Sequence, residues 1–258
     1  MPLRMDGPAL GGGDGRHDIG RMLIMMISLL LSTPEEFVKA VSARDLATVN
    51  ASLQADPALA NATNPRGISV TLVALFAIPK GEEVFLDPKS NEVLQAVLAR
   101  KPKFGLFETA AFGTAEELDA LLKEDPKRVA ERSSFGWTPL HVATFAGNVA
   151  TTQLLIDRGA DVNSRAKSKF RNTPLQTALL TGQYATAKLV LDHGADVLVR
   201  QAEGFTPMHE AAESGREDLV KLLLSYGAEI TSRADDGSTP LDVAKKAKHE
   251  NVIALLTK

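Results

Sequence analysis

The sequence contains no cysteine, which removes several classes of protein from consideration. Disulfide-stabilised scaffolds, zinc sites built from thiolates and enzymes with a cysteine nucleophile are excluded. Aromatic residues are scarce, with 10 Phe, 2 Tyr and 1 Trp among 258 residues, which suits helices rich in Ala and Leu better than a β-sandwich. The net charge of -3 gives no general attraction for a phosphate backbone. Hydrophobic residues still make up 44% of the chain, enough to form a core and to exclude wholesale disorder.

The first 33 residues differ in composition from the rest of the chain. They hold six of the 19 glycines and five of the six methionines. The glycine-rich run at 11–15 lacks the Lys-Ser/Thr and the preceding strand of a phosphate-binding loop, so we expect a flexible linker there. The apolar run Met22–Leu31 is too short to cross a bilayer, which needs about 20 residues.

Two interpretations of this apolar run remain open. It has the length of the core of an export signal, but nearby aspartates cancel the preceding arginines and no small-x-small cleavage site follows. Alternatively, translation begins at Met22, Met25 or Met26 rather than at Met1, and the run is a short lead-in to the first helix. We expect a cytoplasmic protein, with export as the alternative.

Three motifs recur in one phase in the C-terminal half. Thr-Pro tetrapeptides begin at residues 138, 173, 206 and 239, at spacings of 35, 33 and 33. Gly-Ala-Asp-Val or a close variant begins at residues 159, 194 and 227, and a mid-repeat glycine occurs at residues 147, 182 and 215. Agreement of three motifs indicates an internal repeat of about 33 residues.

Each motif has a physical role in a helix-turn-helix unit. Thr before Pro is a helix start, because the hydroxyl caps a free backbone N–H and Pro needs no hydrogen bond at the first helical position. The mid-repeat glycine separates two helices. The second helix, for example over 217–226, is apolar nearly all round and must be covered on more than one side. Gly227 then supplies the left-handed residue that commonly ends a helix.

These motifs resemble those of ankyrin-repeat proteins. Residues 135–258 match as three full repeats and a terminal one, in which Asp242 replaces His and three lysines give the polar cap that a stack needs. The resemblance implies an all-α solenoid that binds proteins and has no enzymatic activity. The Asp-Pro-Ala-Leu variant at 56–59 is similar to those of bacterial ankyrin proteins and implies a bacterial origin.

The upstream half repeats less plainly, with three features shared at an offset of 69 residues. We therefore predict about seven helix-turn-helix repeats, the first three degenerate. Their approximate bounds are 34–66, 67–103, 104–134, 135–168, 169–201, 202–234 and 235–258. Helices in the degenerate part are expected near 34–43, 46–54, 68–78, 91–100, 105–112 and 115–123.

One segment interrupts the second repeat, where Ile78–Ser90 replaces a turn of about four residues. It is either a tolerated loop insertion, since lengthening a loop costs little free energy, or a binding finger with Val84, Phe85 and Leu86 at its tip.

No catalytic or metal-binding pattern emerges, and no cofactor is expected. The resemblance implies that His141 and His209 form hydrogen bonds within their own repeats. The segment 209–213 resembles a zinc-protease helix, but Glu213 stands where the second His is needed, and we interpret it as an exposed helix face.

The resemblance places partner contacts on the hairpin loop before each Thr-Pro motif, here called a finger, and on the exposed face of each first helix. Aromatics on three successive fingers are either interface anchors or packing residues. A basic finger between residues 163 and 173, followed by acidic fingers, either orients a partner or is a solvated surface. The predicted partner-binding residues are Phe135, Trp137, Phe145, Arg165, Lys167, Lys169, Phe170, Phe205, Glu213, Asp235 and Asp236.

The sequence therefore predicts a monomeric, non-enzymatic scaffold that binds a protein partner on its concave surface. We expect neither nucleic-acid binding nor a membrane span. The alternative is an exported or envelope-associated effector that uses the same surface.

Overall fold

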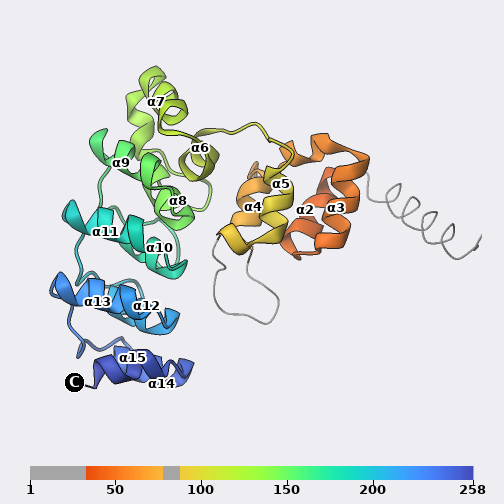
Figure 1. Ribbon diagram of the computed structural model, residues 1–258. Coiled ribbons are helices and arrows are strands. Elements are labelled where there is room, and N and C mark those ends of the chain that lie inside the picture. Colours follow the sequence, from red (N-terminus) through yellow and green to blue (C-terminus); the bar gives the residue numbers. More distant parts are fainter. Residues whose placement is uncertain (1–32, 78–87, 258) are drawn as a thin grey trace, which may run out of the picture.

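The computed structural model describes residues 33–77 and 88–257 (Figure 1). Within these ranges the chain forms fourteen α-helices, three short 3-10 helices and no strand, which confirms the predicted all-α fold. The tail expected over residues 1–33 lies outside the described residues except for Thr33. Most of the expected insertion, residues 78–87, lies outside them as well.

The α-helices follow one another in pairs along the chain. The pairs are α2 (Pro34–Ser42) and α3 (Leu46–Ala55), α4 (Val70–Phe76) and α5 (Glu92–Leu98), α6 (Leu106–Phe112) and α7 (Ala115–Glu124), α8 (Pro139–Ala146) and α9 (Val149–Asp157), α10 (Pro174–Leu180) and α11 (Tyr184–Asp192), α12 (Pro207–Ser214) and α13 (Glu217–Ser225), and α14 (Pro240–Ala247) and α15 (Glu250–Leu256). The 3-10 helices are η1 (Pro57–Asn61), η2 (Pro88–Ser90) and η3 (Pro126–Ala130). All six helices expected in the degenerate part are present, within two residues of their expected ends.

The Thr-Pro motifs begin helices as predicted. Thr206 is extended and Pro207 occupies the first turn of α12. Nδ1 of His209 lies 3.1 Å from the backbone nitrogen of Thr206 and 2.8 Å from its hydroxyl oxygen. The imidazole therefore caps the N-terminus of the helix in its own repeat. Gly215 ends α12 in the left-handed region, with φ of 68°.

The helix pairs form two groups rather than one uninterrupted stack (Figure 1). In the larger group, here called the stack (α6–α15), the even-numbered helices form an inner layer and the odd-numbered helices an outer one. In the smaller group, the N-terminal unit (α2–α5), α4 packs on α2 and α5 on α3. Among the described helices, no comparable packing joins α4 to α6 or α5 to α7.

The N-terminal unit lies beside the inner helices and fingers of the stack (Figure 1). One apolar cluster begins with Phe37 and Val41 in this unit and continues into Trp137, Val142 and Phe145 of the stack. Two further clusters fill the stack itself. The N-terminal unit therefore covers part of the concave surface on which partner binding was expected.

Backbone hydrogen bonds hold neighbouring fingers in register. The amide of Lys167 donates to the carbonyl of Gly136 at 3.0 Å, and the amide of Ala202 donates to that of Phe170 at 3.0 Å. The amide of Asp235 donates to the carbonyl of Glu203 at 3.1 Å. These bonds fix the surface that the fingers present.

Candidate partner-binding groove

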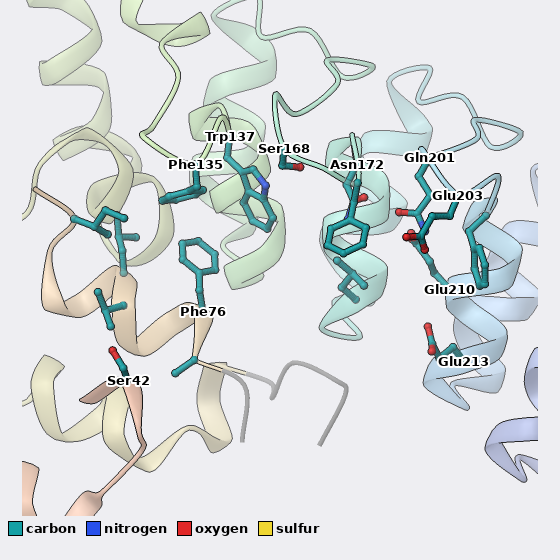
Figure 2. Close-up of a pocket in the computed structure, with 17 residues that line it drawn as sticks. Ser42, Phe76, Phe135, Trp137, Ser168, Asn172, Gln201, Glu203, Glu210 and Glu213 are labelled. Carbon is teal, nitrogen blue, oxygen red and sulfur yellow. The ribbon is translucent and has the colours of Figure 1, made fainter. Parts of the chain in front are cut away.

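A groove of about 710 Å³ lies between the N-terminal unit and the inner face of the stack (Figure 2). Helix α4 forms one wall, and α10, α12 and three successive fingers form the other. We call it the concave groove. Its lining residues are Ser42, Ile68, Leu72, Val73, Phe76, Ala77, Phe135, Trp137, Ser168, Phe170, Asn172, Leu180, Gln201, Glu203, Phe205, Glu210 and Glu213.

Aromatic side chains close one end of the groove. The ring centroid of Phe76 lies 4.9 Å from that of Phe135, 5.1 Å from Trp137 and 5.2 Å from Phe145, in edge-to-face arrangements. This geometry is the favourable one for aromatic pairs. Because α4 occupies this part of the concave face, Trp137 is only 9% exposed and Phe145 is fully buried. The expectation that Phe145 lies on an exposed helix face is therefore wrong.

Carboxylates gather at the other end. Figure 2 shows Glu203, from a finger, together with Glu210 and Glu213, from α12, at the end remote from Phe76. Glu203 and Glu213 are exposed, whereas Glu210 is buried. The interpretation of residues 209–213 as an exposed helix face is wrong for all but Glu213, because His209, Glu210, Ala211 and Ala212 are buried.

Glu210 is incompletely hydrogen-bonded. Its Oε1 accepts a hydrogen bond from Nε2 of Gln176 at 3.2 Å, but its Oε2 is buried without a partner. Burial raises the pKa of this carboxyl well above its ordinary value, and the charge of Glu213 raises it further. The hydrogen bond from Gln176 acts in the opposite direction. Oδ1 of Asn172, in the same groove, is also buried without a partner.

The two motif histidines bridge repeats in addition to capping their own helices. Nε2 of His141 donates to the carbonyl of Asn172 at 3.0 Å. Nε2 of His209 donates to the carbonyl of Ser238 at 3.1 Å. Burial lowers the pKa of His141 to about 4 and also lowers that of His209. Both rings are therefore neutral near pH 7, and the role within the repeat that was expected for them is confirmed.

Five of the predicted partner-binding residues meet in the groove. They are Phe135, Trp137, Phe170, Phe205 and Glu213. Of these aromatics, Phe170 is 45% exposed, and Phe205 is half-buried with its ring 5.1 Å from that of His209. Phe170 and Phe205 therefore remain accessible, whereas Trp137 is taken up by packing within the chain.

The basic side chains Arg165, Lys167 and Lys169 lie outside the groove lining, although other residues of the same finger belong to it. Arg165 donates from Nη1 to the carbonyl of Arg200 at 2.8 Å, which ties its finger to the next one. Nζ of Lys169 lies 5.3 Å from the centroid of the neighbouring Phe170 ring. The side chain of Lys167 is exposed.

The acidic finger also lies outside it. Asp235 accepts from Nη2 of Arg200 at 3.1 Å. The hydroxyl and the amide of Ser238 both donate to Asp236, and these bonds lower the pKa of its carboxyl. The predicted change of charge sign along the fingers is present, but Arg165, Asp235 and Asp236 bond to the chain itself.

Sequence reasoning missed Phe76 and Glu210. A signal for Glu210 is nevertheless visible, because the equivalent residues of the other repeats are Val142, Thr177 and Val243. Its hydrogen-bond partner departs from the pattern too, since Gln176 stands in the histidine position of its own repeat. No comparable signal marks Phe76, whose role depends on how the N-terminal unit packs.

The shape and lining of the groove suit it to binding. It has an apolar end and an acidic end, and side chains of three successive fingers line it between them. In the described part of the chain, no group of three or more His, Cys, Asp or Glu side chains is arranged to hold a metal ion. No helix in residues 33–77 or 88–257 is both long and apolar enough to cross a membrane.

Comparison with known families agrees with the architecture of the stack. A family model described as ankyrin repeats (3 copies) matches residues 106–201, 164–234 and 199–258. These matches begin at the first residue of α6 and together cover more than half of the chain. No curated protein matches the chain significantly. Ankyrin repeats indicate a protein–protein interaction module and are typically non-enzymatic. The chain belongs to the ankyrin-repeat family.

Proposed function

We propose that this protein is a non-enzymatic, monomeric interaction module that binds a segment of one protein partner in the concave groove. The groove carries this proposal, because it places accessible aromatic side chains beside unpaired hydrogen-bonding groups on adjacent repeats. Aromatic side chains in partly enclosed, apolar surroundings are favoured anchors of protein interfaces. Repeat stacks also commonly bind through their concave surface.

The packing of the N-terminal unit narrows this proposal. Phe145 is fully buried, Trp137 is nearly so, and the ring of Phe135 packs against Phe76. The remaining aromatic contacts for a partner are Phe170 and Phe205. The fingers that carry them are joined by the hydrogen bond from Ala202 to Phe170, so both rings project from a braced backbone. A preorganised surface loses less conformational entropy when it binds.

The test is capture of partners by the full-length chain and by a groove variant. Phe170→Ala with Phe205→Ala removes the two accessible aromatics. Val149→Ala with Tyr184→Ala is the matched control, because both side chains are exposed apolar groups on outer helices. We expect the wild type and the control to retain the same protein from a native lysate and the groove variant to lose it. Equal retention by the groove variant would refute the proposed surface.

The other parts of the proposal have their own measurements. Sedimentation equilibrium should give a mass near the 27.6 kDa of one chain. In a gel-shift titration, duplex DNA and single-stranded RNA should not bind at physiological salt. If either does bind, and Lys167→Glu with Lys169→Glu abolishes the shift, the basic finger is a nucleic-acid site and the proposal is wrong on this point.

A further inference from the structure

Three aromatic side chains of the stack are covered by a ring from the N-terminal unit. Phe135 and Trp137 lie on the finger before α8, and Phe145 lies on α8 itself. We call these three side chains the aromatic patch. The ring of Phe76, on α4, packs edge-to-face on all three, and Figure 2 shows it beside Phe135 and Trp137. One part of the molecule therefore occupies a site on another part.

Hydrogen bonds within the stack hold the aromatic patch in place. Its finger is closed by the amide of Ser133, which donates to the carbonyl of Trp137 at 2.9 Å. The carbonyl of Gly136 accepts from the amide of Lys167 and from Nη1 of Arg132, both at 3.0 Å. Helix α8 packs between α6 and α10 in the inner layer. The patch should therefore keep its shape when Phe76 leaves it.

The N-terminal unit is a separate packing group. It has apolar side chains of its own that are fully buried, among them Phe37, Val41, Val49 and Leu53. The layers of the stack are not continued into it, because no comparable packing joins α4 to α6 or α5 to α7 among the described helices. Phe76 is only half-buried, so its contact lies at the surface of the molecule. Such a contact can open while both groups stay folded.

The aromatic patch would have the character of a binding site once it is uncovered. Three rings would then face the concave side of a repeat stack, which is the side through which such stacks commonly bind. Exposed aromatic clusters of this kind mark protein interfaces. Helix α4 shows what fits, since it is a short helix of the sequence VTLVALF, without a charged residue and with an aromatic side chain at its last position.

We propose that the aromatic patch is a second binding site, for an aromatic side chain carried on an apolar helical segment of a partner. Phe76 occupies the site in the free protein, so the partner binds by displacing the N-terminal unit. The site is distinct from the open part of the groove at Phe170 and Phe205, and the inference does not depend on the function proposed there. Because few molecules are open at any time, the apparent affinity is lower than the intrinsic affinity by the open fraction.

The probe is a phage-displayed library of random dodecapeptides, selected on full-length Phe76→Ala, in which the patch is uncovered more often. We expect the selected peptides to share an aromatic residue within an apolar, helix-forming sequence. Binding of one such peptide is then measured by calorimetry to wild type, Phe76→Ala, Phe76→Leu and the control Tyr184→Ala. Tyr184 is an exposed aromatic residue on the outer helix α11 and does not line the groove.

The peptide should bind Phe76→Ala at least about tenfold more tightly than wild type, because the variant lacks the ring that competes for the patch. Tyr184→Ala should equal wild type. Phe76→Leu keeps an apolar side chain in place and should give an intermediate affinity, so the comparison does not depend on the alanine variant alone. Replacing the aromatic residue of the peptide with alanine should abolish binding to all four proteins.

Hydrogen exchange separates displacement of the N-terminal unit from mere filling of the space that Phe76→Ala leaves. When the peptide saturates the wild type, exchange should become faster in α4 and α5 and remain slow in α10 to α13. Trp137 should stay shielded from acrylamide, because the aromatic residue of the peptide takes the place of Phe76. Opening without binding would expose Trp137 instead.

Four results would overturn the inference. A peptide that binds Phe76→Ala but not wild type, at concentrations up to about 1 mM, only fills an artificial space. Binding to wild type without faster exchange in α4 and α5 would mean that the N-terminal unit is not displaced. Selected peptides without a shared aromatic residue, or no selected peptide at all, would refute the site.

The fourth result uses the other end of the groove. Adding Phe170→Ala and Phe205→Ala to Phe76→Ala should leave the affinity unchanged within about twofold, because those two rings lie outside the patch. If binding is lost instead, the peptide uses the open part of the groove. The second site is then refuted, whereas the proposed function is supported.

Discussion

Replacing Phe76 with alanine should release the N-terminal unit from the stack. The Phe76 ring makes three edge-to-face contacts with Phe135, Trp137 and Phe145, each worth about 0.5–1.5 kcal/mol. Since Phe76 is only partly buried, the full cost of about 3–5 kcal/mol for Phe→Ala in a core does not apply. We expect the variant to lose about 2–4 kcal/mol of the free energy that holds the two groups together. A loss of 2.8 kcal/mol would raise the population of the open form about a hundredfold.

Trp137 reports this change directly, because it is the single tryptophan of the chain and is 9% exposed. In Phe76→Ala its emission should move to longer wavelength and its quenching by acrylamide should increase. Hydrogen exchange should become faster in α4 and α5 and remain slow in α10 to α13. The matched control is Phe104→Ala, which removes a ring that is paired with Phe112 and that does not line the concave groove. If emission and quenching in Phe76→Ala equal those of the wild type, Phe76 does not cover Trp137 and the described packing is wrong.

Three further predictions concern the stack. Gly136→Ala should lower the free energy of unfolding by clearly more than Gly227→Ala, measured by urea denaturation. Both glycines have positive φ, so an alanine at either position is strained by about 1–3 kcal/mol. A Cβ at Gly136 would also lie 2.7 Å from the backbone of the next finger, whereas a Cβ at Gly227 would meet no atom within 4 Å. Lowering the pH from 6.5 to 4 should destabilise the protein through His141. The pKa of this ring is 6.5 in the unfolded chain and about 4 in the folded protein, so only the unfolded state binds a proton over most of this range. The loss is about 3 kcal/mol and should be absent in His141→Gln. Arg165→Met should cost about 1 kcal/mol of stability and leave partner binding unchanged, because Arg165 bonds to a neighbouring finger outside the groove.

A specific result would contradict each of these three predictions. Equal losses in Gly136→Ala and Gly227→Ala would mean that the fingers are not closely apposed. An unchanged acid dependence in His141→Gln would assign the loss of stability to other groups. Weakened partner binding in Arg165→Met, without a loss of stability, would place Arg165 on the binding surface.

The helices could be predicted because their signals are local. A Thr-Pro pair begins a helix through its proline ring and through contacts within the first turn, and a glycine after the second helix ends it, whatever lies elsewhere in the chain. The repeat offset extended these signals to the degenerate part, where α4 and α5 were expected within two residues of their ends. The buried state of Phe145 could not be predicted in this way. In an uninterrupted stack it would lie on the open concave face, whereas here the distant Phe76 packs against it.

The acidic end of the groove was predicted in part, since Glu213 was among the expected contacts. Glu210 was assigned to an exposed face together with the rest of residues 209–213, which lack the second histidine of a zinc-protease helix. Its burial depends on the neighbouring α10, from which Gln176 reaches it. The role of Arg165 was missed for a similar reason, because its acceptor is a carbonyl on the next finger, 35 residues away. Contacts between repeats are thus less visible in the sequence than the repeats themselves.

The connection between α5 and α6 makes the packing of the N-terminal unit an intramolecular, tethered contact. Only residues 99–105 separate the last residue of α5 from the first of α6. A short linker gives the two surfaces it joins an effective concentration of about millimolar. The aromatic contact therefore stays closed even if its intrinsic affinity is weak. A free competitor at micromolar concentration would have to bind the same aromatic patch about a thousandfold more tightly to displace the unit.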